Sequence, residues 1–334
     1  MRAKIIWLTT NSCAGDIISM LNSLHPNYRQ ITEEHFTLCY ESFTMAGEGK
    51  IATGVLEEAL NGPAGEYIFV VEGTVPVAAE GFYCIIGHRN GKPWTALQAV
   101  KELAAKAKYV VAAGTCAAFG GPYAAHPNPI GSKPVSAVVP QKVINVPGCP
   151  VHPDWILGTL FHLAEYGEPR LDEQNRPVLY YGETIHDRCE RRHYFESGVF
   201  AAKPGEPWCM YKIGCKGPVT HADCPVRHWC GEHVNWPVGA NTPCIGCTSP
   251  EFPDGTAPFF EHLPDLQTPL GKVTADRAGL LTGAATVLGI GAHLAANIAT
   301  GRLARTLRKG RHKQSKTAQA LRKLFSRREG KAEG

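Results

Sequence analysis

Residues 4–24 decide the fold, and they read Lys-Ile-Ile-Trp-Leu-Thr-Thr-Asn-Ser-Cys-Ala-Gly-Asp-Ile-Ile-Ser-Met-Leu-Asn-Ser-Leu. The first part, residues 4–10, is apolar and β-branched, which predicts a buried strand. From Ile17 onward the apolar residues recur at the spacing of a helix. Between them the chain turns and presents a thiol, Cys13, and a carboxylate, Asp16. Open α/β sheets place their binding sites at such a strand end, beside a helix N-terminus.

The same alternation of strand and helix continues along the first 180 residues. Four more short apolar runs are typical of strands, and they cover residues 36–40, 67–71, 109–113 and 143–146. Helical patterns separate them at residues 51–60, 94–106 and 154–166. Strands separated by helices of this length predict an α/β fold with a doubly wound parallel sheet in flavodoxin-like order. We expect this sheet to form a first domain over residues 1–180.

Chemically active side chains follow the predicted strands at the point where each strand ends. Cys13 and Asp16 follow the first strand and Glu72 the third, while Cys116 (in Gly-Thr-Cys) and Cys149 (in Pro-Gly-Cys-Pro) follow the last two. In a parallel sheet these ends share one edge, so the side chains should converge. Three thiolates and one carboxylate would complete the ligands of a [4Fe–4S] cluster. Two alternatives stay open: the cysteines are packing residues, or Asp16 only caps the following helix.

Residues 181–270 do not continue the alternation of strands and helices, and they are rich in glycine, proline and cysteine. Because such a segment buries little apolar surface, we expect metal sites to stabilise a second domain here. One group of donors comprises His186, Cys189, Cys209 and Cys215. Their spacing is consistent with either an iron–sulfur cluster or a structural zinc ion.

A second group of donors combines Cys224 with the Pro-Cys-Ile-Gly-Cys knuckle of Cys244 and Cys247. Cys230 stands in the same part of the chain and is either a fourth ligand or an unliganded buried thiol.

The whole chain has 12 cysteines among 334 residues, which is unusual. The first residues run straight into a strand without a leader sequence, so we expect a cytoplasmic location, free or at the cytoplasmic face of a membrane. In a reducing compartment many cysteines indicate metal ligands rather than disulfides. Only Cys39 and Cys84 lack a partner motif, and we expect them to be packing residues.

Residues 271–334 form a third part, a helix followed by a basic tail. Residues 278–300 carry no Asp, Glu, Lys or Arg, and as a helix they would span about 35 Å, enough to cross a bilayer. Residues 302–334 hold 12 Lys or Arg and 2 Asp or Glu. The helix either reaches the membrane periphery or packs on a partner subunit, and the missing export signal favours packing. No nucleic-acid recognition fold accompanies the tail, so we expect no nucleic-acid partner.

Six motifs follow one another along residues 1–270: Cys-x2-Asp, Gly-Thr-Cys, Pro-Gly-Cys-Pro, His-x2-Cys, Gly-Cys-Lys-Gly and Pro-Cys-x2-Cys. In this order they resemble the small subunits of nickel–iron hydrogenases. The resemblance implies the electron-relay subunit of a heterodimer that oxidises H2, with the Ni–Fe site in the large subunit. It also implies a dimer of heterodimers and an external electron acceptor, which is either of quinone or cytochrome type or of a kind that the sequence does not identify.

The resemblance further implies three iron–sulfur clusters, a proximal and a distal [4Fe–4S] and a medial cluster that is [4Fe–4S] or [3Fe–4S]. The implied ligands are Cys13, Asp16, Cys116 and Cys149 for the proximal cluster, His186, Cys189, Cys209 and Cys215 for the distal one, and Cys224, Cys244, Cys247 and, as an optional fourth, Cys230 for the medial one. Pro237 matches a proline that replaces a fourth medial cysteine in the family.

Asp16 departs from the family pattern, which has a cysteine at this position. A Cys3Asp site resembles the actinobacterial-type, oxygen-insensitive hydrogenases. Oxygen-tolerant membrane-bound members carry two extra cysteines, which correspond here to Gly15 and Gly121. Glu72 is expected to shape the proximal loop without binding iron. Two other functions remain open: a hydrogen-sensing regulatory hydrogenase with the same clusters, and a zinc-stapled scaffold without a redox role.

Overall fold

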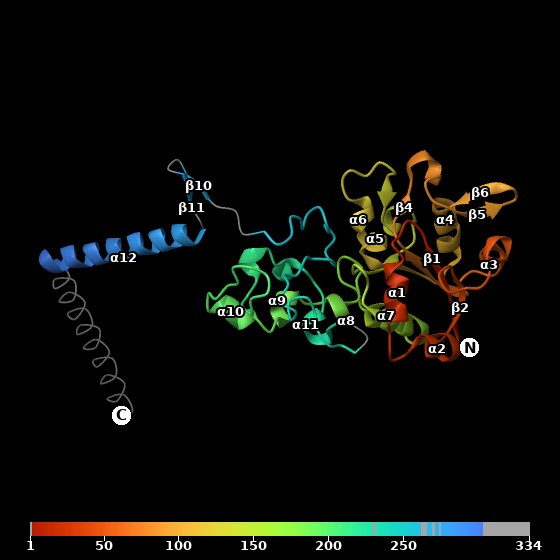
Figure 1. Ribbon diagram of the computed structural model, residues 1–334, viewed down its shortest axis with the longest axis horizontal. Helices are drawn as coiled ribbons and strands as arrows, with labels where there is room; N and C mark the ends of the chain where they lie inside the picture. The colour runs from red at the N-terminus through yellow and green to blue at the C-terminus, as the bar shows by residue number, and fades with distance from the viewer. Residues whose placement is uncertain (1, 230–231, 262–265, 269–270, 274, 303–334) are drawn as a thin grey trace, which may run out of the picture. The chain divides into compact units, whose positions relative to one another are not determined.

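The computed structural model describes residues 2–229, 232–261, 266–268, 271–273 and 275–302 (Figure 1). The chain divides into two compact units, Met1–His262 and Leu263–Gly334, which are described separately.

A sheet of five parallel strands organises the first unit. The strands are β1 (Ala3–Thr9), β2 (Phe36–Glu41), β3 (Tyr67–Glu72), β7 (Tyr109–Ala113) and β9 (Val143–Val146). Their order across the sheet is β2-β1-β3-β7-β9, which confirms the flavodoxin-like arrangement. Thr9 pairs with Glu72, Glu72 with Ala113 and Ala113 with Val146, so the carboxyl ends of four strands lie side by side.

Helices cover both faces of this sheet (Figure 1). The main helices are α1 (Gly15–Leu21) and α7 (Pro153–Glu165) on one face and α3 (Gly49–Asn61) and α4 (Ala96–Lys106) on the other. The side chains of β1 alternate between the faces, because successive residues of a strand point in opposite directions. Ile5 and Trp7 pack with α1 and α7, whereas Ile6 and Leu8 pack with α3 and α4.

The helix predicted over residues 94–106 begins two residues later, at Ala96. Thr95 caps it: the Thr95 hydroxyl accepts from the Gln98 N–H (3.2 Å) and the Gln98 side chain accepts from the Thr95 N–H (3.3 Å). The residues before it form a hairpin that the sequence analysis did not predict, β5 (Ile85–Arg89) with β6 (Lys92–Thr95). Its Asn-Gly turn at residues 90–91 has positive φ at both positions, which is a recognisable hairpin signal.

Shorter elements complete the sheet region: α2 (Tyr28–Gln30), the π-helical turn η1 (Ile31–His35), the paired strands β4 (Val75–Pro76) and β8 (Ser132–Lys133), α5 (Gly114–Phe119), α6 (Gly121–Ala124), and the 3-10 turns η2 (Ala78–Gly81) and η3 (Val135–Ala137).

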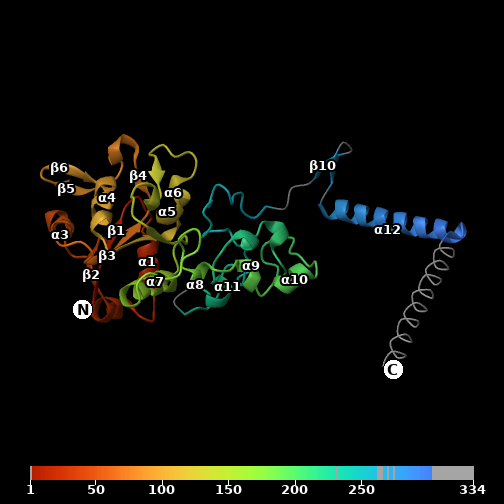
Figure 2. The same ribbon diagram turned by 180° about the vertical axis from the view of Figure 1, so that it is seen from behind.

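Beyond α7, the described part of the cysteine-rich region is mostly irregular, as predicted (Figures 1 and 2). Its helices are single turns: α8 (Val178–Tyr181), α9 (Ile185–Arg188), α10 (Arg192–Glu196), α11 (Cys224–Arg227), η4 (Tyr211–Ile213) and η5 (Gly217–Val219). Tyr181, Ile185 and Trp236 continue the core formed under α7, and a separate small cluster contains Met210 and Ile213.

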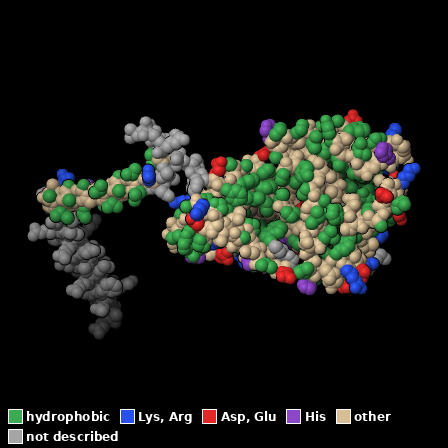
Figure 3. Space-filling model, in the orientation of Figure 1, with side chains coloured by type: hydrophobic (Ala, Val, Ile, Leu, Met, Phe, Trp, Pro, Cys, Tyr) green, Lys and Arg blue, Asp and Glu red, His purple; other side chains and the backbone are tan. Residues whose placement is uncertain are grey.

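The second unit contains an antiparallel pair, β10 (Leu266–Thr268) and β11 (Gly271–Val273), and the helix α12 (Ala275–Ala299). By length and composition α12 could cross a membrane. Apolar side chains occur along its length (Figure 3). Leu280, Leu288 and Ile290 are each more than 60% exposed. The predicted basic tail from residue 303 onward lies outside the described residues.

Candidate metal centres

The strand ends bring the first predicted group of donors together. Cys13 follows β1, Asp16 lies in the first turn of α1, Cys116 lies in α5 after β7, and Cys149 follows β9. Burial above all raises the pKa of the Cys116 and Cys149 thiols to about 12, and the negative charges of Asp16 and Cys13 add to both shifts. The four side chains are therefore close neighbours at the carboxyl edge of the sheet. Cys13 and Cys149 are exposed as whole residues, although surrounding protein atoms exclude much of the water from the Cys149 thiol.

Hydrogen bonds join the loops that carry these four donors. The backbone N–H of Val151 donates to Oδ1 of Asp16 (2.7 Å), and the hydroxyl of Ser19 donates to the carbonyl of Val151 (2.6 Å). Thr115 and Gly148 bond to each other twice: Thr115 N–H to the Gly148 carbonyl (2.8 Å) and Gly148 N–H to the Thr115 hydroxyl (2.9 Å). The protein thus fixes the relative positions of the loops through its own contacts.

Glu72, rather than Asp16, satisfies the first N–H groups of α1. This carboxylate is fully buried at the end of β3 and accepts from the backbone N–H groups of Asp16 (3.1 Å) and Ile17 (3.2 Å). It also accepts from the Trp7 indole (2.9 Å) and the Ser12 hydroxyl (3.0 Å). Glu72 therefore shapes the first loop, and helix capping does not explain the Asp16 side chain.

The Asp16 carboxylate is directed instead toward the other strand ends. Burial, followed by the charge of Glu72, raises the pKa of Asp16 to about 8, although the hydrogen bond from Val151 lowers it. A carboxylate that is so costly to ionise by itself is stabilised in its charged form when it binds a metal cation such as iron. Gly114 has φ +78°, and a Cβ there would lie 2.1 Å from Oδ2 of Asp16, so only glycine leaves room for this carboxylate.

The second group of donors lines a single pocket in the cysteine-rich region. Its walls include His186, which lies in α9, together with Cys189, Cys209 and Cys215. The His186 ring packs edge-on against Phe195, with centroids 4.7 Å apart. The four side chains predicted to act together are thus neighbours in the fold.

The third group surrounds a mainly apolar cavity of about 340 Å³. Cys224, the first residue of α11, lines this cavity together with Pro237. Cys244 and Cys247 of the Pro-Cys-Ile-Gly-Cys segment line it as well. Burial raises the pKa of all three thiols. Thiols that are buried in this way become thiolates only when a cation replaces their protons, as iron does.

The three groups adjoin one another in a fixed order. Cys149 of the first group also lines the cavity of the third, and the hydroxyl of Thr115 donates to the carbonyl of Cys247. On the other side, the N–H of Lys216 donates to the carbonyl of Cys244 (2.8 Å), next to Cys215 of the second group. The third group, made of Cys224, Cys244 and Cys247, therefore lies between the first and second groups.

The remaining predicted cysteines fall outside this arrangement or outside the described residues. Cys230 lies outside the described residues. Cys39 packs against the α3–α4 side of the core, and Cys84 is a half-buried free thiol. Among the described residues, no three His, Cys, Asp or Glu side chains are arranged to bind a single metal ion.

Two family models match the chain. Residues 181–260 match the C-terminal family of NiFe/NiFeSe hydrogenase small subunits, and residues 13–163 match the family of the 20 Kd subunit of NADH ubiquinone oxidoreductase.

Curated relatives and solved structures extend this similarity. The periplasmic [NiFeSe] hydrogenase small subunit of Desulfomicrobium baculatum is 37% identical over 276 residues, covering 78% of this chain and 87% of the relative. Its solved structure in a reduced, active form superimposes with a TM-score of 0.75, covering 79% of this chain and all of that one. The quinone-reactive Ni/Fe-hydrogenase small chain of Wolinella succinogenes is 36% identical over 304 residues, which are 87% of this chain and 85% of the relative.

The chain belongs to the family of [NiFe] hydrogenase small subunits. It is the electron-relay subunit of a heterodimeric hydrogenase, and it carries electrons from the Ni–Fe site of the large subunit through iron–sulfur clusters. An actinobacterial-type NiFe-hydrogenase from Ralstonia eutropha H16 also superimposes, with a TM-score of 0.73 at 28% identity, over 87% of this chain and 91% of that one.

The predicted cytoplasmic location is wrong. The D. baculatum relative is named as a periplasmic protein, and further relatives carry the same word in their names. The prediction rested on the first residues alone, which do not decide the compartment because a leader peptide is removed from a mature exported protein.

Arg191 of this small subunit supports a cluster at the second group of donors. Its side chain is only 7% exposed and donates to the carbonyls of Glu206 (3.1 Å) and Trp208 (3.3 Å) and to the amide oxygen of Asn241. Among the described residues no carboxylate forms an ion pair with this guanidinium. A buried cation without a counter-charge is costly, whereas a cluster with cysteine ligands is anionic and would provide that charge.

The sequence analysis missed two residues beside the cysteines, Arg191 and Trp229. Arg191 donates its backbone N–H to Sγ of Cys189 (3.4 Å), and Trp229 donates its indole N–H to Sγ of Cys224 (3.3 Å). Proximity in the sequence was the available signal, since Arg191 is two residues after a predicted ligand and Trp229 five residues after another.

Proposed function

We propose that electrons pass through three clusters of this small subunit in the order proximal, medial, distal. The proposed ligands are Cys13, Asp16, Cys116 and Cys149 for the proximal cluster, Cys224, Cys244 and Cys247 for the medial cluster, and His186, Cys189, Cys209 and Cys215 for the distal cluster. When bound, the clusters supply one-electron redox chemistry, and the protein sets their positions and surroundings.

The contiguity of the three groups carries this proposal. Cys149 belongs to the proximal group and to the medial cavity wall, and the Lys216–Cys244 hydrogen bond joins the medial group to the distal one. Imidazole in place of thiolate raises a cluster's potential, so His186 suits the last position before an acceptor. The arrangement also favours clusters over zinc, because the ligands of a cluster bind separate iron atoms and stand apart, as the described donors do.

The test is iron and acid-labile sulfide analysis of the purified heterodimer. We expect about twelve irons per small subunit if every cluster is a cubane, and about eleven if the medial cluster is [3Fe–4S]. Cys116→Ala should lower the iron content and remove the proximal signal. Cys84→Ala is the matched control, because Cys84 belongs to none of the three groups, and it should leave the content unchanged. A wild-type heterodimer without iron and sulfide would overturn the proposal.

We further propose that Asp16 binds an iron of the proximal cluster, which places the chain near the actinobacterial-type, oxygen-insensitive hydrogenases. The burial of its carboxylate and the fold similarity to the Ralstonia protein support this assignment. Gly15 and Gly121 stand where the oxygen-tolerant members carry extra cysteines, and a Cβ at either position would lie 3.0 Å from a cysteine sulfur, so these two positions lack the extra thiols.

Two substitutions at Asp16 test its role. Asp16→Cys should keep the cluster and shift its reduction potential, because a thiolate is a softer ligand than a carboxylate. Asp16→Ala should weaken the cluster and reduce the proximal signal in electron paramagnetic resonance. An unchanged proximal spectrum in Asp16→Ala would mean that the carboxylate does not bind iron.

For the medial cluster, Cys230 decides between the two cluster types. The Cys224, Cys244 and Cys247 thiols with Pro237 suit [3Fe–4S], and a fourth thiol would suit [4Fe–4S]. Cys230→Ala should therefore leave the medial signal unchanged if three cysteines suffice, and should convert it to a [3Fe–4S] signal if Cys230 is a ligand.

We also propose that α12 attaches the complex to the membrane and thereby brings it to a quinone or cytochrome acceptor, as a dimer of heterodimers. A helix that is apolar on all sides and exposed needs apolar surroundings, and the described part of α12 fits that description. A heterodimer truncated after residue 273 should move from the carbonate-washed membrane fraction to the soluble fraction. Release of the full-length complex by the same wash would instead indicate that α12 packs on a partner subunit.

A further inference from the structure

One indole in the wall of the medial cavity donates a hydrogen bond to a proposed ligand. The Nε1–H of Trp229 lies 3.3 Å from Sγ of Cys224, whose residue is only 5% exposed. Among the hydrogen bonds of the described residues, no other cysteine of the three groups accepts one from a side chain. Trp229 itself lines the cavity, so its donor and the proposed cluster share the same sulfur.

Aromatic side chains from the start of α7 hold this indole in place. The Trp229 ring packs edge-on against His152 (centroids 4.8 Å apart) and against Trp155 (5.5 Å). His152 is 1% exposed, and its Nδ1 accepts from the N–H of Asp154 (3.1 Å), so its Nε2 carries the proton and donates to the carbonyl of His228 (2.7 Å). That carbonyl immediately precedes Trp229, so the backbone is fixed as well as the ring.

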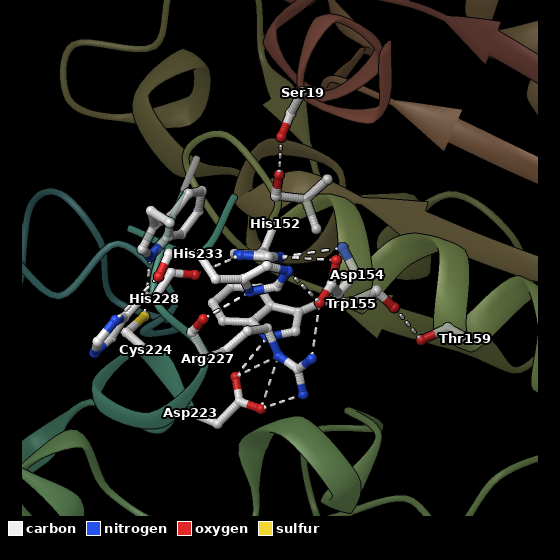
Figure 4. Close-up of polar contacts among 12 residues, drawn as sticks. Ser19, His152, Asp154, Trp155, Thr159, Asp223, Cys224, Arg227, His228 and His233 are labelled. Atoms are coloured by element: carbon white, nitrogen blue, oxygen red, sulfur yellow. Dashed lines mark hydrogen bonds and ion pairs between the residues drawn. The ribbon is translucent and has the colours of Figure 1, made fainter. Parts of the chain in front are cut away.

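Charged groups fix the other side of Cys224 (Figure 4). The Trp155 indole donates to Oδ1 of Asp223 (2.7 Å), and Arg227 pairs with the same carboxylate (2.6 Å). Arg227 also pairs with Asp154 on α7 (2.9 Å). The segment that carries Cys224 is therefore bound to the rigid sheet domain at both ends, and the short distance from Trp229 to sulfur is a fixed feature of the fold.

We propose that Trp229 is a positioning residue of the electron relay that raises the reduction potential of the medial cluster through its N–H···S hydrogen bond. The inference rests on the proposed assignment of Cys224 as a medial ligand. An N–H dipole stabilises negative charge on a thiolate sulfur, and a reduced cluster carries one more negative charge than an oxidised one. The bond therefore favours the reduced state, and hydrogen bonds to sulfur are among the factors that set cluster potentials.

The substitution Trp229→Phe removes the donor and keeps an apolar ring against His152 and Trp155. In a redox titration of the holo-heterodimer followed by electron paramagnetic resonance, we expect the medial midpoint potential to shift to a more negative value. The proximal and distal potentials and the iron content should not change. Trp94→Phe is the control, because Trp94 is a buried indole on the α3–α4 side of the sheet whose Nε1 has no partner among the described residues, and it should shift none of the three potentials.

A second readout detects the contact itself. With indole-15N tryptophan, pulsed electron paramagnetic resonance on the medial signal of the wild type should show a 15N coupling, and Trp229→Phe should lose it. A medial potential that stays the same in Trp229→Phe would overturn the inference. By contrast, a medial signal that survives Cys224→Ala unchanged would overturn the ligand assignment, so the two failures are distinguishable.

Discussion

The proximal group and the other two groups of donors are built in different ways. At the sheet edge, β1, β3, β7 and β9 fix the loops, and contacts such as those of Glu72 and Val151 hold the donors without any metal. In the cysteine-rich region the donors stand on single turns and irregular chain. Local geometry at the sheet edge therefore depends on the parallel sheet, whereas the other region has few hydrogen-bonded elements and depends on what its donors bind.

Removal of iron and sulfide should separate the two regions most strongly. In heterodimer prepared without cluster assembly, we expect amide hydrogen exchange at residues 181–260 to speed up by more than about tenfold, because binding free energy contributes to folding there. The strands β1, β3 and β7 should keep their protection. Equal protection of both regions in the cluster-free protein would contradict the comparison.

Gly114→Ala should damage the sheet-edge group without touching the cysteine-rich region. The new Cβ would lie 2.1 Å from the Asp16 carboxylate at a φ of +78°, and strain plus overpacking should cost about 3 kcal/mol of stability. Loss of the proximal signal and a lower melting temperature are the expected measurements. Gly65→Ala is the matched control: Gly65 has φ +83° but nothing within 4 Å of its Cβ, so a smaller loss of stability and a normal proximal signal are expected there.

Glu72→Gln should have a somewhat smaller effect at the same edge. A glutamine amide keeps the shape of the side chain but accepts hydrogen bonds less strongly than a carboxylate. Its NH2 group cannot accept at all, so a donor at Trp7, Ser12 or the start of α1 would lose its partner. We expect a loss of about 2 kcal/mol, measured by denaturation of the heterodimer. Glu66→Gln, on an exposed carboxylate that pairs with Lys4 at 3.4 Å, should cost little. Equal losses in the two variants would mean that the buried contacts of Glu72 do not stabilise the loop.

The smallest expected effect is a pH dependence of the folding stability, which arises from His152 at the contact between the two regions. Burial lowers the pKa of His152 below its ordinary 6.5, so the folded protein keeps it neutral while the unfolded chain takes up a proton. Stability from this group is fully present above pH 6.5 and is lost as the pH falls from 6.5 toward the lower folded pKa. We expect about 1 kcal/mol per pH unit in that window, and a flatter profile in His152→Asn. His193→Asn, on an exposed histidine, should leave the slope unchanged.

Much of the sheet, and the convergence of the first group of donors at its edge, could be predicted from the sequence, because strands and the cysteines that follow them are local patterns. The strand over residues 143–146 was predicted at its observed bounds, and Cys13, Cys116 and Cys149 each follow a recognisable strand. The hydrogen-bond partners of the Asp16 side chain could not be predicted, since Val151, which donates to it, is 135 residues away. Glu72, which accepts from the first N–H groups of α1 in place of Asp16, comes from another strand.

Long-range contacts also explain what was missed in the cysteine-rich region. The burial of Arg191 depends on carbonyls 15 and 17 residues further on, and the position of Trp229 depends on α7. Neither residue belongs to a ligand motif, so their closeness in the sequence to a predicted ligand was the one available signal, and it does not reveal these contacts. The turn at residues 90–91, by contrast, was a local signal that was overlooked.

The hydroxyl of Thr115 bonded to the carbonyl of Cys247, next to the proximal thiol of Cys116, has a consequence for how such a relay can vary. The same holds for the Lys216–Cys244 bond on the distal side. The Lys216–Cys244 bond joins main-chain groups alone, so exchanging side chains leaves it in place, whereas the other contact requires a hydroxyl at residue 115. On the proposed assignment of the three groups, changes of other side chains alter how strongly each cluster attracts an electron and leave this contact between the medial and distal groups unchanged.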